Sequence, residues 1–357
     1  MLFPISTPLS YAVVGPLAAR LAGDGRYEVV ISSRHVGARE SIRILGPGVR
    51  RVHRLTAPFR FFDAVVCPGF YFRPRRATHL IQMFHGVSPK NYAARDDVKR
   101  FESLFVIGEY HRNKMIRAGC FDDFDDLDTR VGRIGMPKLD RLVCPDAEFH
   151  AEVTSVRGSA ERPCVLYAPT RSGAAGSSLE SFGLEVVERL ARMPVDLIVK
   201  LHDRSETRFR RKLTVDYRAE IRRRAPQARL AEGHDVVPLL AAADVLVSDL
   251  SSVAGEYTLL DRPIVLLACP EHEAKIRQSG RSKFGPDDEQ DLDWMQAMGE
   301  RVEDAASAAA AVERALGDPG ARSELRRERA TALFYNPGGA TTAAALSLES
   351  ILGMETR

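Results

Sequence analysis

Short apolar runs recur along the chain at intervals that suit an alternation of strands and helices. They lie at residues 29–32, 64–67, 80–84 and 104–107 in the N-terminal half, and at 164–168, 195–201, 243–248 and 263–268 in the C-terminal half. Runs without polar alternation are typical of strands buried on both faces of a parallel sheet. The segments 179–192 and 204–224 between them have helical composition, so the order of elements predicts an α/β fold.

The series of strands stops once and starts again, which indicates two sheets. The chain has 357 residues, more than one hydrophobic core usually accommodates. The sequence GRIGMPKLDRLV at 132–143 is expected to be the end of a first domain. The polar stretch 145–163 is expected to be a linker. We therefore expect two Rossmann-like domains that face each other across a cleft, at residues 1–145 and 146–332.

Composition argues against several classes of protein. No stretch approaches the ~20 apolar residues that a helix needs to cross a bilayer. The N-terminal sequence has no basic region ahead of its apolar part and is interrupted by Pro4, Pro8 and Pro16, so we expect no signal peptide and a cytoplasmic chain. The cysteines lack CxxC spacing, which argues against a disulfide framework and a zinc site. They are Cys67, Cys120, Cys144, Cys164 and Cys269.

Charge is distributed unevenly, although the net charge is only +3. Residues 1–120 carry 19 Lys and Arg against 8 Asp and Glu, so the N-terminal half is strongly basic. Such an excess favours an anionic partner, such as a phosphate polymer, a lipid headgroup surface or nucleic acid. The alternative is that these arginines are ordinary solvated surface residues.

Two consecutive serines follow one strand of the predicted C-terminal domain. In open α/β sheets, ligands bind beyond the carboxyl ends of the strands. The segment VLVSDLSSVAGEYTLLDRPIVLL at 245–267 ends a strand at Ser248 and begins a helix with Ser251 and Ser252. These serines are good helix N-caps, but their amides and hydroxyls also suit a diphosphate. Glu256 lies one helical turn beyond Ser252, a spacing that suits contact with ribose hydroxyls.

A histidine follows a strand in the N-terminal half. In QMFHGVSPK at 82–90, His85 comes directly after an apolar run, and Gly86 allows the backbone to approach a ligand. An imidazole in this place can accept a proton from an attacking hydroxyl. Gly86, Ser88 and Lys90 are the candidates for the acceptor side. The alternatives are a histidine bonded within its loop and a lysine that is merely exposed.

Two further strands of the C-terminal half end in polar residues. YAPTRSG at 167–173 supplies Thr170, Arg171 and Ser172, and VKLHDRS at 199–205 supplies Lys200 and His202. The guanidinium of Arg171 can form a forked contact with phosphate oxygens, and His202 can stabilise charge that develops on a diphosphate. Each segment by itself is only weak evidence for a binding site. The evidence is stronger because each βα unit of the predicted domain supplies one such segment.

These motifs, in this order, resemble the CDP-glycerol glycerophosphotransferases of teichoic-acid and capsule synthesis. The resemblance covers about residues 80–270 and is strongest in FHGVSPK, VLYAPTR, IVKLH and LLAAADVLVSDLSSVAGEYTLLDRPIV. It implies a glycosyltransferase B fold, with residues 333–357 as a helix that returns to the first domain. It also implies a CDP-glycerol donor and an anionic or lipid-linked acceptor. Peripheral contact with the inner face of the membrane is expected, and nucleic acid is not expected as a partner.

The resemblance assigns roles to individual residues. His85 is similar to the catalytic base of the family, while His202, Thr170, Ser251 and Ser252 are similar to donor-phosphate contacts. No metal and no cofactor are implied, since histidines, hydroxyls and helix dipoles supply the counter-charge.

The sequence also departs from the family pattern. Val87-Ser88-Pro89 stands where Thr-Pro is usual, and Arg171 where an aromatic is common. Leu250 replaces a usual tyrosine, and Glu256 a frequent aspartate. These changes leave three readings open. They are a glycerophosphotransferase, a nucleotide-sugar glycosyltransferase or UDP-sugar 2-epimerase of the same fold, and a non-catalytic protein that binds an anionic polymer or membrane.

Three other features attract attention. The acidic run FDDFDDLD at 121–128 lacks the glycine and the terminal glutamate of a calcium loop, so we expect a solvated loop. The basic stretch 208–224 is expected to be the solvent face of a helix, and the alternative is that it lies on an anionic membrane surface. Asp235 precedes a predicted helix at 236–242 and suits an N-cap, while His234 is a candidate to approach the nucleobase.

Overall fold

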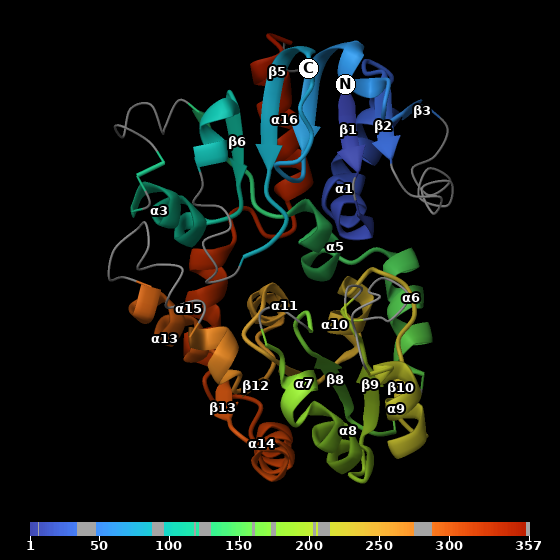
Figure 1. The fold of residues 1–357 in the computed structure, drawn as a ribbon, viewed down its shortest axis with the longest axis vertical. Coiled ribbons are helices and arrows are strands. Elements are labelled where there is room, and N and C mark those ends of the chain that lie inside the picture. Colours follow the sequence, from blue (N-terminus) through green and yellow to red (C-terminus); the bar gives the residue numbers. More distant parts are fainter. Residues whose placement is uncertain are drawn as a thin grey trace. The chain divides into compact units, whose positions relative to one another are not determined.

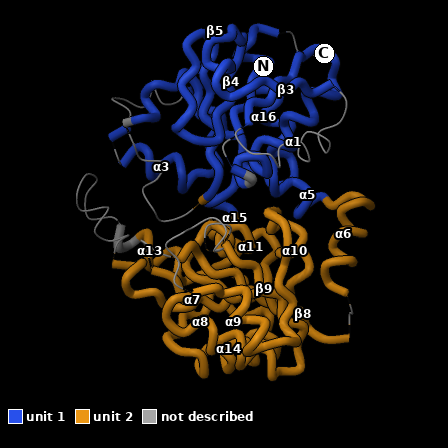
Figure 2. Tube along the Cα trace, turned by 45° about the vertical axis from the view of Figure 1, so that its right-hand side comes forward, with its two compact units in different colours: residues 1–86, 92–144, 331–357 blue, residues 87–91, 145–330 orange. Residues whose placement is uncertain are grey.

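The fold is described from a computed structural model of the chain. It describes residues 1–5, 7–33, 48–87, 96–117, 119–120, 130–158, 161–172, 176–202, 205, 215–274 and 288–354. The chain divides into two compact units (Figure 2). Unit 1 comprises residues 1–86, 92–144 and 331–357, and unit 2 comprises residues 87–91 and 145–330.

Unit 1 is built on a seven-stranded parallel sheet in the order β3-β2-β1-β4-β5-β6-β7 (Figure 1). Its strands are β1 (Leu2–Ile5), β2 (Val29–Ser33), β3 (Val49–His53), β4 (Phe61–Cys67), β5 (Arg76–Met83), β6 (Ser103–Val106) and β7 (Val131–Arg133). Its helices are α1 (Pro8–Asp24), α3 (Glu109–Arg117), α5 (Asp140–Val143) and α16 (Ala340–Ile351), with 3-10 turns η1 (Ala57–Phe59), η2 (Asp96–Arg100) and η3 (Pro137–Leu139). The order of strands is that of a doubly wound sheet.

The core of unit 1 joins the two ends of the chain. Thr7 caps the start of helix α1, where its hydroxyl accepts a hydrogen bond from the Ser10 amide at 3.1 Å, and Gly25 follows the helix in the left-handed conformation. Its apolar face shares one buried cluster with Ala344 and Leu348 of α16. At the start of α16, the amides of Ala340 and Thr341 donate to the carboxylate of Asp140 at 2.9 and 2.7 Å.

Unit 2 is built on a six-stranded parallel sheet in the order β10-β9-β8-β11-β12-β13. Its strands are β8 (Cys164–Ala168), β9 (Asp196–Val199), β10 (Arg229–Leu230), β11 (Val245–Ser248), β12 (Ile264–Leu267) and β13 (Glu300–Val302). Its helices are α6 (Ala147–Arg157), α7 (Ser178–Ser181), α8 (Gly183–Ala191), α9 (Tyr217–Arg224), α10 (Val237–Ala242), α11 (Ser252–Tyr257), α13 (Asp288–Gln296) and α14 (Ala305–Gly317). The 3-10 turn η6 (Thr258–Leu260) follows α11, and α15 (Ser323–Leu333) continues from unit 2 into unit 1.

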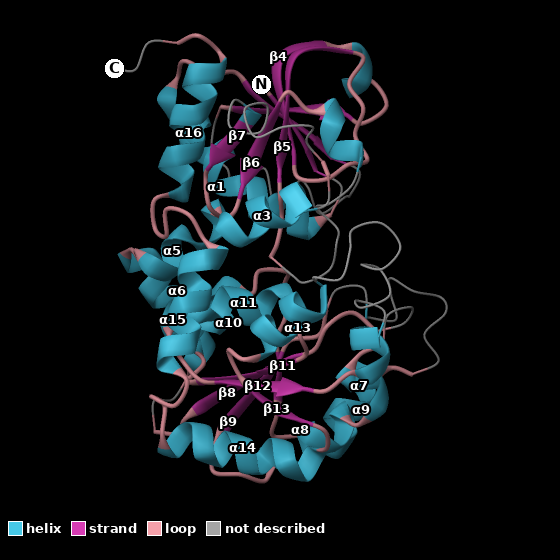
Figure 3. Cartoon of the chain, turned by 90° about the vertical axis from the view of Figure 1, so that its left-hand side faces the viewer, coloured by secondary structure: helices cyan, strands magenta, loops and turns pink. Residues whose placement is uncertain are grey.

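The sheet of unit 2 is covered on both faces, as its apolar strands require. Helices α8 and α14 lie against one face, and α10 and α11 lie on the other (Figure 3). Buried side chains of α8 and α14, including Val187, Leu190 and Val312, form one cluster with Val165 of β8 and Val247 of β11. The prediction of an α/β protein with two parallel sheets is confirmed.

Two local predictions are wrong. The stretch 145–163 is not a linker throughout, because residues 147–157 form α6, which is capped by the Asp146 side chain accepting from the Phe149 amide at 2.7 Å. The helix expected at 204–224 is not continuous, because residues 215 and 216 are not helical and α9 begins at Tyr217, where the side chain of Asp216 caps it through the amide of Ala219 at 3.2 Å. Much of the basic stretch 208–224, and the whole acidic run 121–128, lie outside the described residues.

Candidate functional site

Polar side chains gather where the central strands of unit 2 end. Strands β9, β8 and β11 are parallel neighbours, so their carboxyl ends lie at one edge of the sheet. The predicted residues directly after these strands are therefore brought to that edge. They are Thr170, Arg171 and Ser172 after β8, Lys200 and His202 after β9, and Ser251 and Ser252 after β11.

Asp249, the first residue after β11, connects two of these segments. Its carboxylate is fully buried, and its Oδ2 accepts from the Thr170 amide at 2.8 Å, the Ser177 hydroxyl at 3.2 Å and the Ser178 amide at 3.3 Å. Burial raises the pKa of Asp249, against the lowering effect of these hydrogen bonds. Burial and then the charge of Asp249 raise the pKa of the Cys269 thiol. Asp249 thus fixes the chain after β8 to the end of β11.

Ser251 does not act as an ordinary helix cap. It occupies the N-cap position of α11 with extended dihedral angles, but its side chain makes no capping hydrogen bond to the helix backbone. Its hydroxyl instead lies 3.3 Å from the hydroxyl of Ser248, which donates to the Ala168 carbonyl at 2.6 Å. Ser251 and Ser252 are both half-buried. Helix capping, the purely structural explanation for a serine at this position, therefore does not account for Ser251.

The segments after β8 and β9 are tied to each other. The amide of Ser172 donates to the hydroxyl of Ser205 at 2.8 Å, and the amide of Ser205 donates to the His202 carbonyl at 2.7 Å. The ammonium of Lys200 is buried and donates to the Leu201 carbonyl at 2.8 Å. This arrangement positions a cation and hydroxyl groups at the carboxyl edge of the sheet.

The remaining donor-side candidates have different environments. Arg171 and His202 are half-buried, whereas Thr170 is buried. Glu256 lies on α11 and is only 1% exposed. His234 is exposed and follows β10, four residues after Leu230.

The predicted cap at Asp235 is offset by one residue. Helix α10 begins at Val237, and Val236 occupies its N-cap position without a side-chain bond. Asp235 nevertheless accepts from the Val237 amide at 2.9 Å. The carboxylate therefore satisfies the first amide of the helix from one position earlier than an N-cap.

The predicted base of unit 1 lies just beyond β5. His85 is half-buried, and its Nδ1 lies 2.9 Å from the carbonyl oxygen of Pro68. A carbonyl can only accept, so the proton of this bond belongs to Nδ1, and Nε2 is then the basic nitrogen of the neutral ring. Gly86 follows it and is also half-buried, while Ser88 and Lys90 lie outside the described residues. His85 is thus held in a tautomer that can accept a proton at Nε2.

A second histidine, which was not predicted, lies close to this base. His111 of α3 packs edge-on against the ring of Phe84, with centroids 4.3 Å apart. Burial, then the charges of Lys114 and His85, lower the pKa of His111 to about 3. His111 therefore stays neutral at physiological pH and contributes no charge beside His85.

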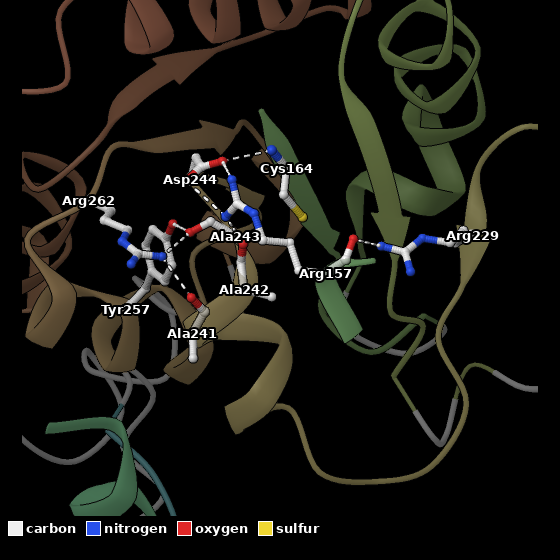
Figure 4. Close-up of polar contacts among 9 residues, drawn as sticks. All are labelled: Arg157, Cys164, Arg229, Ala241, Ala242, Ala243, Asp244, Tyr257 and Arg262. Atoms are coloured by element: carbon white, nitrogen blue, oxygen red, sulfur yellow. Dashed lines mark hydrogen bonds and ion pairs between the residues drawn. The ribbon is translucent and has the colours of Figure 1, made fainter. Parts of the chain in front are cut away.

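The amino edge of the unit 2 sheet carries a different polar network (Figure 4). The guanidinium of Arg157 forms two bonds with the Asp244 carboxylate, at 3.2 and 2.8 Å, and one with the Ala242 carbonyl at 2.8 Å. Asp244 also accepts from the Cys164 amide at 2.8 Å. Arg262 donates to the carbonyls of residues 241 and 243, at 2.8 and 2.6 Å. These bonds satisfy the carbonyls at the end of α10. The role of the network is therefore structural.

Sequence reasoning missed the residues that hold the carboxyl edge together, namely Asp249, Ser177, Ser178 and Ser205. Asp249 carried a signal, because a carboxylate directly after a buried strand must find donors. The serines carried none, since their partners are distant in sequence. Among the described residues, no group of three His, Cys, Asp or Glu side chains is arranged to hold a metal ion. No helix in the described part of the chain has the length and apolar character to span a membrane.

Two teichoic acid glycerol-phosphate primases are similar in sequence to this chain. The teichoic acid glycerol-phosphate primase of Bacillus subtilis (strain 168) is 25% identical over 250 residues, covering 64% of this chain and 61% of the primase. The corresponding primase of Bacillus spizizenii is 28% identical over 184 residues, covering 48% of this chain and 43% of that protein. The chain therefore spans less than two thirds of the length of the curated relatives it matches.

Solved structures share the fold. The wall teichoic acid polymerase TagF superposes with a TM-score of 0.69 at 14% identity, over 99% of this chain and 89% of that chain. The UDP-GlcNAc 2-epimerase of Neisseria meningitidis bound to UDP-GlcNAc superposes with a TM-score of 0.61 at 13% identity, over 99% of both chains. These similarities confirm the glycosyltransferase B type of architecture.

The family comparison covers the sites of both units. Residues 55–274 match the family model described as CDP-glycerol:poly(glycerophosphate) glycerophosphotransferase. That range contains His85 together with the polar segments that follow β8, β9 and β11. The match extends over more than half of the chain and agrees with the resemblance of the sequence motifs. The chain belongs to the CDP-glycerol:poly(glycerophosphate) glycerophosphotransferase family.

Proposed function

We propose that the protein transfers glycerol phosphate, or a related polyol phosphate, from a CDP-activated donor to an acceptor hydroxyl in the synthesis of a cell-surface polymer. The observation that carries the proposal is the family match over residues 55–274, which includes both His85 and the Ser251-Ser252 pair. A solved structure of the polymerase TagF, which shares the fold, is of a histidine variant soaked with CDPG. That similarity supports the same class of donor here.

In the proposed reaction, unit 2 holds the donor diphosphate. Arg171, Lys200 and His202 supply positive charge and hydrogen-bond donors, and the hydroxyls of Ser251 and Ser252 supply further contacts. Thr170, Ser172, Glu256 and His234 complete the proposed donor-side set. The bonds of Asp249 to the Thr170 and Ser178 amides support this role, because they fix the segments that bear these groups.

In the same reaction, His85 is the general base. Its Nε2 takes the proton of the acceptor hydroxyl while that oxygen bonds to the β-phosphorus of the donor. The bond between the β-phosphorus and the oxygen that bridges to the α-phosphate breaks, and CMP leaves with the bonding electrons. The bond between Nδ1 and the Pro68 carbonyl supports this role, since it stabilises the imidazolium that forms. Gly86, Ser88 and Lys90 are the proposed acceptor-side neighbours.

We further propose that the chemistry needs no metal and no cofactor, because the cationic and hydroxyl groups of the chain can neutralise the charge of the transition state. The acceptor is expected to be anionic or lipid-linked, with the enzyme acting at the inner face of the membrane. Turnover should then persist in EDTA, and a loss of activity that Mg²⁺ restores would contradict the metal-free reaction.

The test of the proposal is the nucleotide that is released. Incubation with CDP-glycerol and an acceptor should release CMP, while UDP-sugars should release no UDP. UDP release or sugar epimerisation would instead favour the second candidate, which the shared fold of the UDP-GlcNAc 2-epimerase keeps open. Salt-sensitive binding to anionic polymers without any turnover would favour a binding protein.

The role of His85 is tested by replacement with alanine. We expect turnover to fall by ~100-fold or more on general-base grounds, while CDP-glycerol still binds. Replacement by alanine of His79, a half-buried histidine of β5 whose Nδ1 lies 3.0 Å from the Glu102 carboxylate, is the matched control and should leave turnover unchanged. Full activity of the His85→Ala variant would show that His85 is not the base.

A further inference from the structure

The connection between β4 and β5 is short for two parallel strands. Parallel neighbours are usually joined by a dozen or more residues that include a helix. Here residues 68–75 make the connection alone, and none of them is helical. We call residues 68–75 the crossover segment. Because it has no helix to pair its backbone carbonyls, other groups of the chain must supply the donors.

Arg100, at the end of the turn η2, supplies two of these donors. Its guanidinium donates to the carbonyl of Phe70 at 2.6 Å and to the carbonyl of Phe72 at 3.1 Å. The same guanidinium lies over the ring of Phe101, 4.5 Å from the ring centre. The planar fork of an arginine can bridge two carbonyls of one segment, whereas the ammonium of a lysine has no such fixed geometry. Arg100 therefore holds the crossover segment against η2.

The crossover segment begins with the residue that orients His85. The carbonyl oxygen of Pro68 lies 2.9 Å from Nδ1 of His85 and selects the tautomer in which Nε2 can accept a proton. Pro68 lies two residues before Phe70, so the bond from Arg100 to the Phe70 carbonyl restricts where the Pro68 carbonyl can point. An N–H···O hydrogen bond spans about 2.7–3.2 Å, so a shift of about 1 Å in this carbonyl would break the bond to His85.

A second set of contacts connects Arg100 with His85. The ring of Phe70 packs edge-on against the ring of Phe101, with centroids 6.0 Å apart, and against the ring of Phe84, with centroids 6.3 Å apart. All three phenylalanines are buried. Phe84 is the residue directly before His85. The series of side chains that begins at Arg100 thus reaches the base independently of the crossover backbone.

We propose that Arg100 is a positioning residue for the catalytic base, which holds the crossover segment where the Pro68 carbonyl orients His85. The inference rests on the proposed role of His85 as the base, and the reaction rate depends on Arg100 only through His85. Both terminal nitrogens of Arg100 already donate to carbonyls, and its Nε is buried. The guanidinium is therefore engaged within unit 1 rather than displayed for an anionic acceptor.

The first test compares two arginines with matched contacts. Arg262 in unit 2 also donates to two backbone carbonyls, at 2.8 and 2.6 Å, and is half-buried like Arg100. Arg100→Ala and Arg262→Ala should therefore lower the thermal unfolding midpoint by similar amounts. Only Arg100→Ala should lower kcat for CMP release from CDP-glycerol, by ~10-fold or more, with soluble poly(glycerol phosphate) as the acceptor. The Kd for CDP-glycerol should stay the same in both variants.

A further variant separates geometry from charge. Arg100→Lys keeps the positive charge but not the fork, so its kcat should be as low as that of Arg100→Ala. Added methylguanidinium should partly restore the kcat of Arg100→Ala, because it can donate to the same two carbonyls. If Arg100→Lys has the kcat of the wild type, charge alone is sufficient and the positioning role is wrong.

The ring of His85 reports its own position without any turnover. Nitrogen NMR of protein with isotope-labelled histidine should show His85 as a single Nδ1–H tautomer, assigned by the absence of its signals in His85→Ala. The signals should indicate a mixture of tautomers in Arg100→Ala and should be unchanged in Arg262→Ala. If the wild type releases no CMP, the proposed function fails, while the NMR comparison still decides the inference. An unchanged His85 tautomer in Arg100→Ala would overturn it, whatever the enzymatic activity.

Discussion

The two edges of the unit 2 sheet are both polar, but their polar groups are satisfied in different ways. At the amino edge, Arg157, Asp244 and Arg262 bind one another or nearby carbonyls (Figure 4). At the carboxyl edge, Oδ1 of the buried Asp249 has no hydrogen-bond partner among the described residues, and the Ser251 hydroxyl makes no bond to the helix that it precedes. Complete pairing indicates a structural role. A serine hydroxyl that does not cap its helix can instead bind a ligand, while the buried Asp249 carboxylate, which would repel a diphosphate, positions the segments around it.

The comparison separates stability from function within one sheet. A side chain of the amino edge should matter to folding and little to the donor. A side chain of the carboxyl edge should matter to the donor more than to folding. Four changes test this separation.

The largest effect is expected at Asp249. In Asp249→Ala, the amides of Thr170 and Ser178 lose their acceptor, so the segment after β8 is no longer held against β11. Misplacement of catalytic or binding groups by about 1 Å can cost ~100-fold in rate, and we expect kcat/KM to fall by about that factor. Steady-state CMP release measures it, with circular dichroism as the control for folding. A variant that is folded and fully active would show that Asp249 does not position the donor-binding segments.

The next effect is expected at the amino edge. Arg157→Ala removes two bonds to Asp244 and one to the Ala242 carbonyl. Because this pair is partly exposed, we expect the free energy of unfolding to fall by only about 1–2 kcal/mol. Urea denaturation measures the change, and Arg229→Ala, which loses one exposed bond, is the control. The affinity for CDP-glycerol should stay the same. A weakened affinity would contradict a purely structural role of the amino edge.

Ser251→Ala sharpens the comparison further. A true capping residue such as Asp304, which accepts from the Ser307 amide at 2.7 Å, should cost about 1 kcal/mol when replaced by alanine. Ser251 makes no such bond, so its replacement should cost less than about 0.5 kcal/mol. CDP-glycerol affinity should nevertheless fall about 10-fold, as measured by calorimetry. The opposite pattern, lost stability with unchanged affinity, would make Ser251 a cap after all.

The smallest effect concerns pH. Burial raises the pKa of Asp249, so the folded state binds its proton more tightly than the unfolded state. The corresponding stability is present at low pH and is lost as pH rises from about 4 through the folded pKa. Relative to Asp249→Asn, the wild type should therefore become progressively less stable over that interval. Urea titrations at several pH values would show it, and a constant difference would mean that the carboxylate is not destabilised by burial.

The central strands were predictable because they are continuous apolar runs, such as 164–168 and 243–248. The peripheral strands were missed for physical reasons. Strand β3, with the sequence VRRVH, lies at the sheet edge and has mainly exposed side chains, and β10 has only two residues. Strand β1 is an inner, buried strand and was missed for another reason, since its Pro4 suggested an interruption. An edge strand needs no apolar run, so its sequence carries little signal.

The residues after the central strands were predictable as site candidates for the same reason that the strands were. A polar residue directly after a buried strand, such as His85 or Ser251, must lie at the sheet edge. The contacts that orient these residues were not predictable. The bond of His85 to Pro68 and the bond of Asp249 to Thr170 join residues that are 17 and 79 positions apart. Such pairings depend on the strand order, which the sequence alone did not provide.

Hydrogen exchange with and without CDP-glycerol tests the central claim most directly. If the carboxyl edge of the unit 2 sheet binds the donor, the ligand should slow exchange in peptides that cover residues 168–178 and 249–256. Peptides that cover 157–164 and 241–244, at the amino edge, should exchange at the same rate with and without the ligand. Protection confined to the amino edge, or absent from both, would contradict the account.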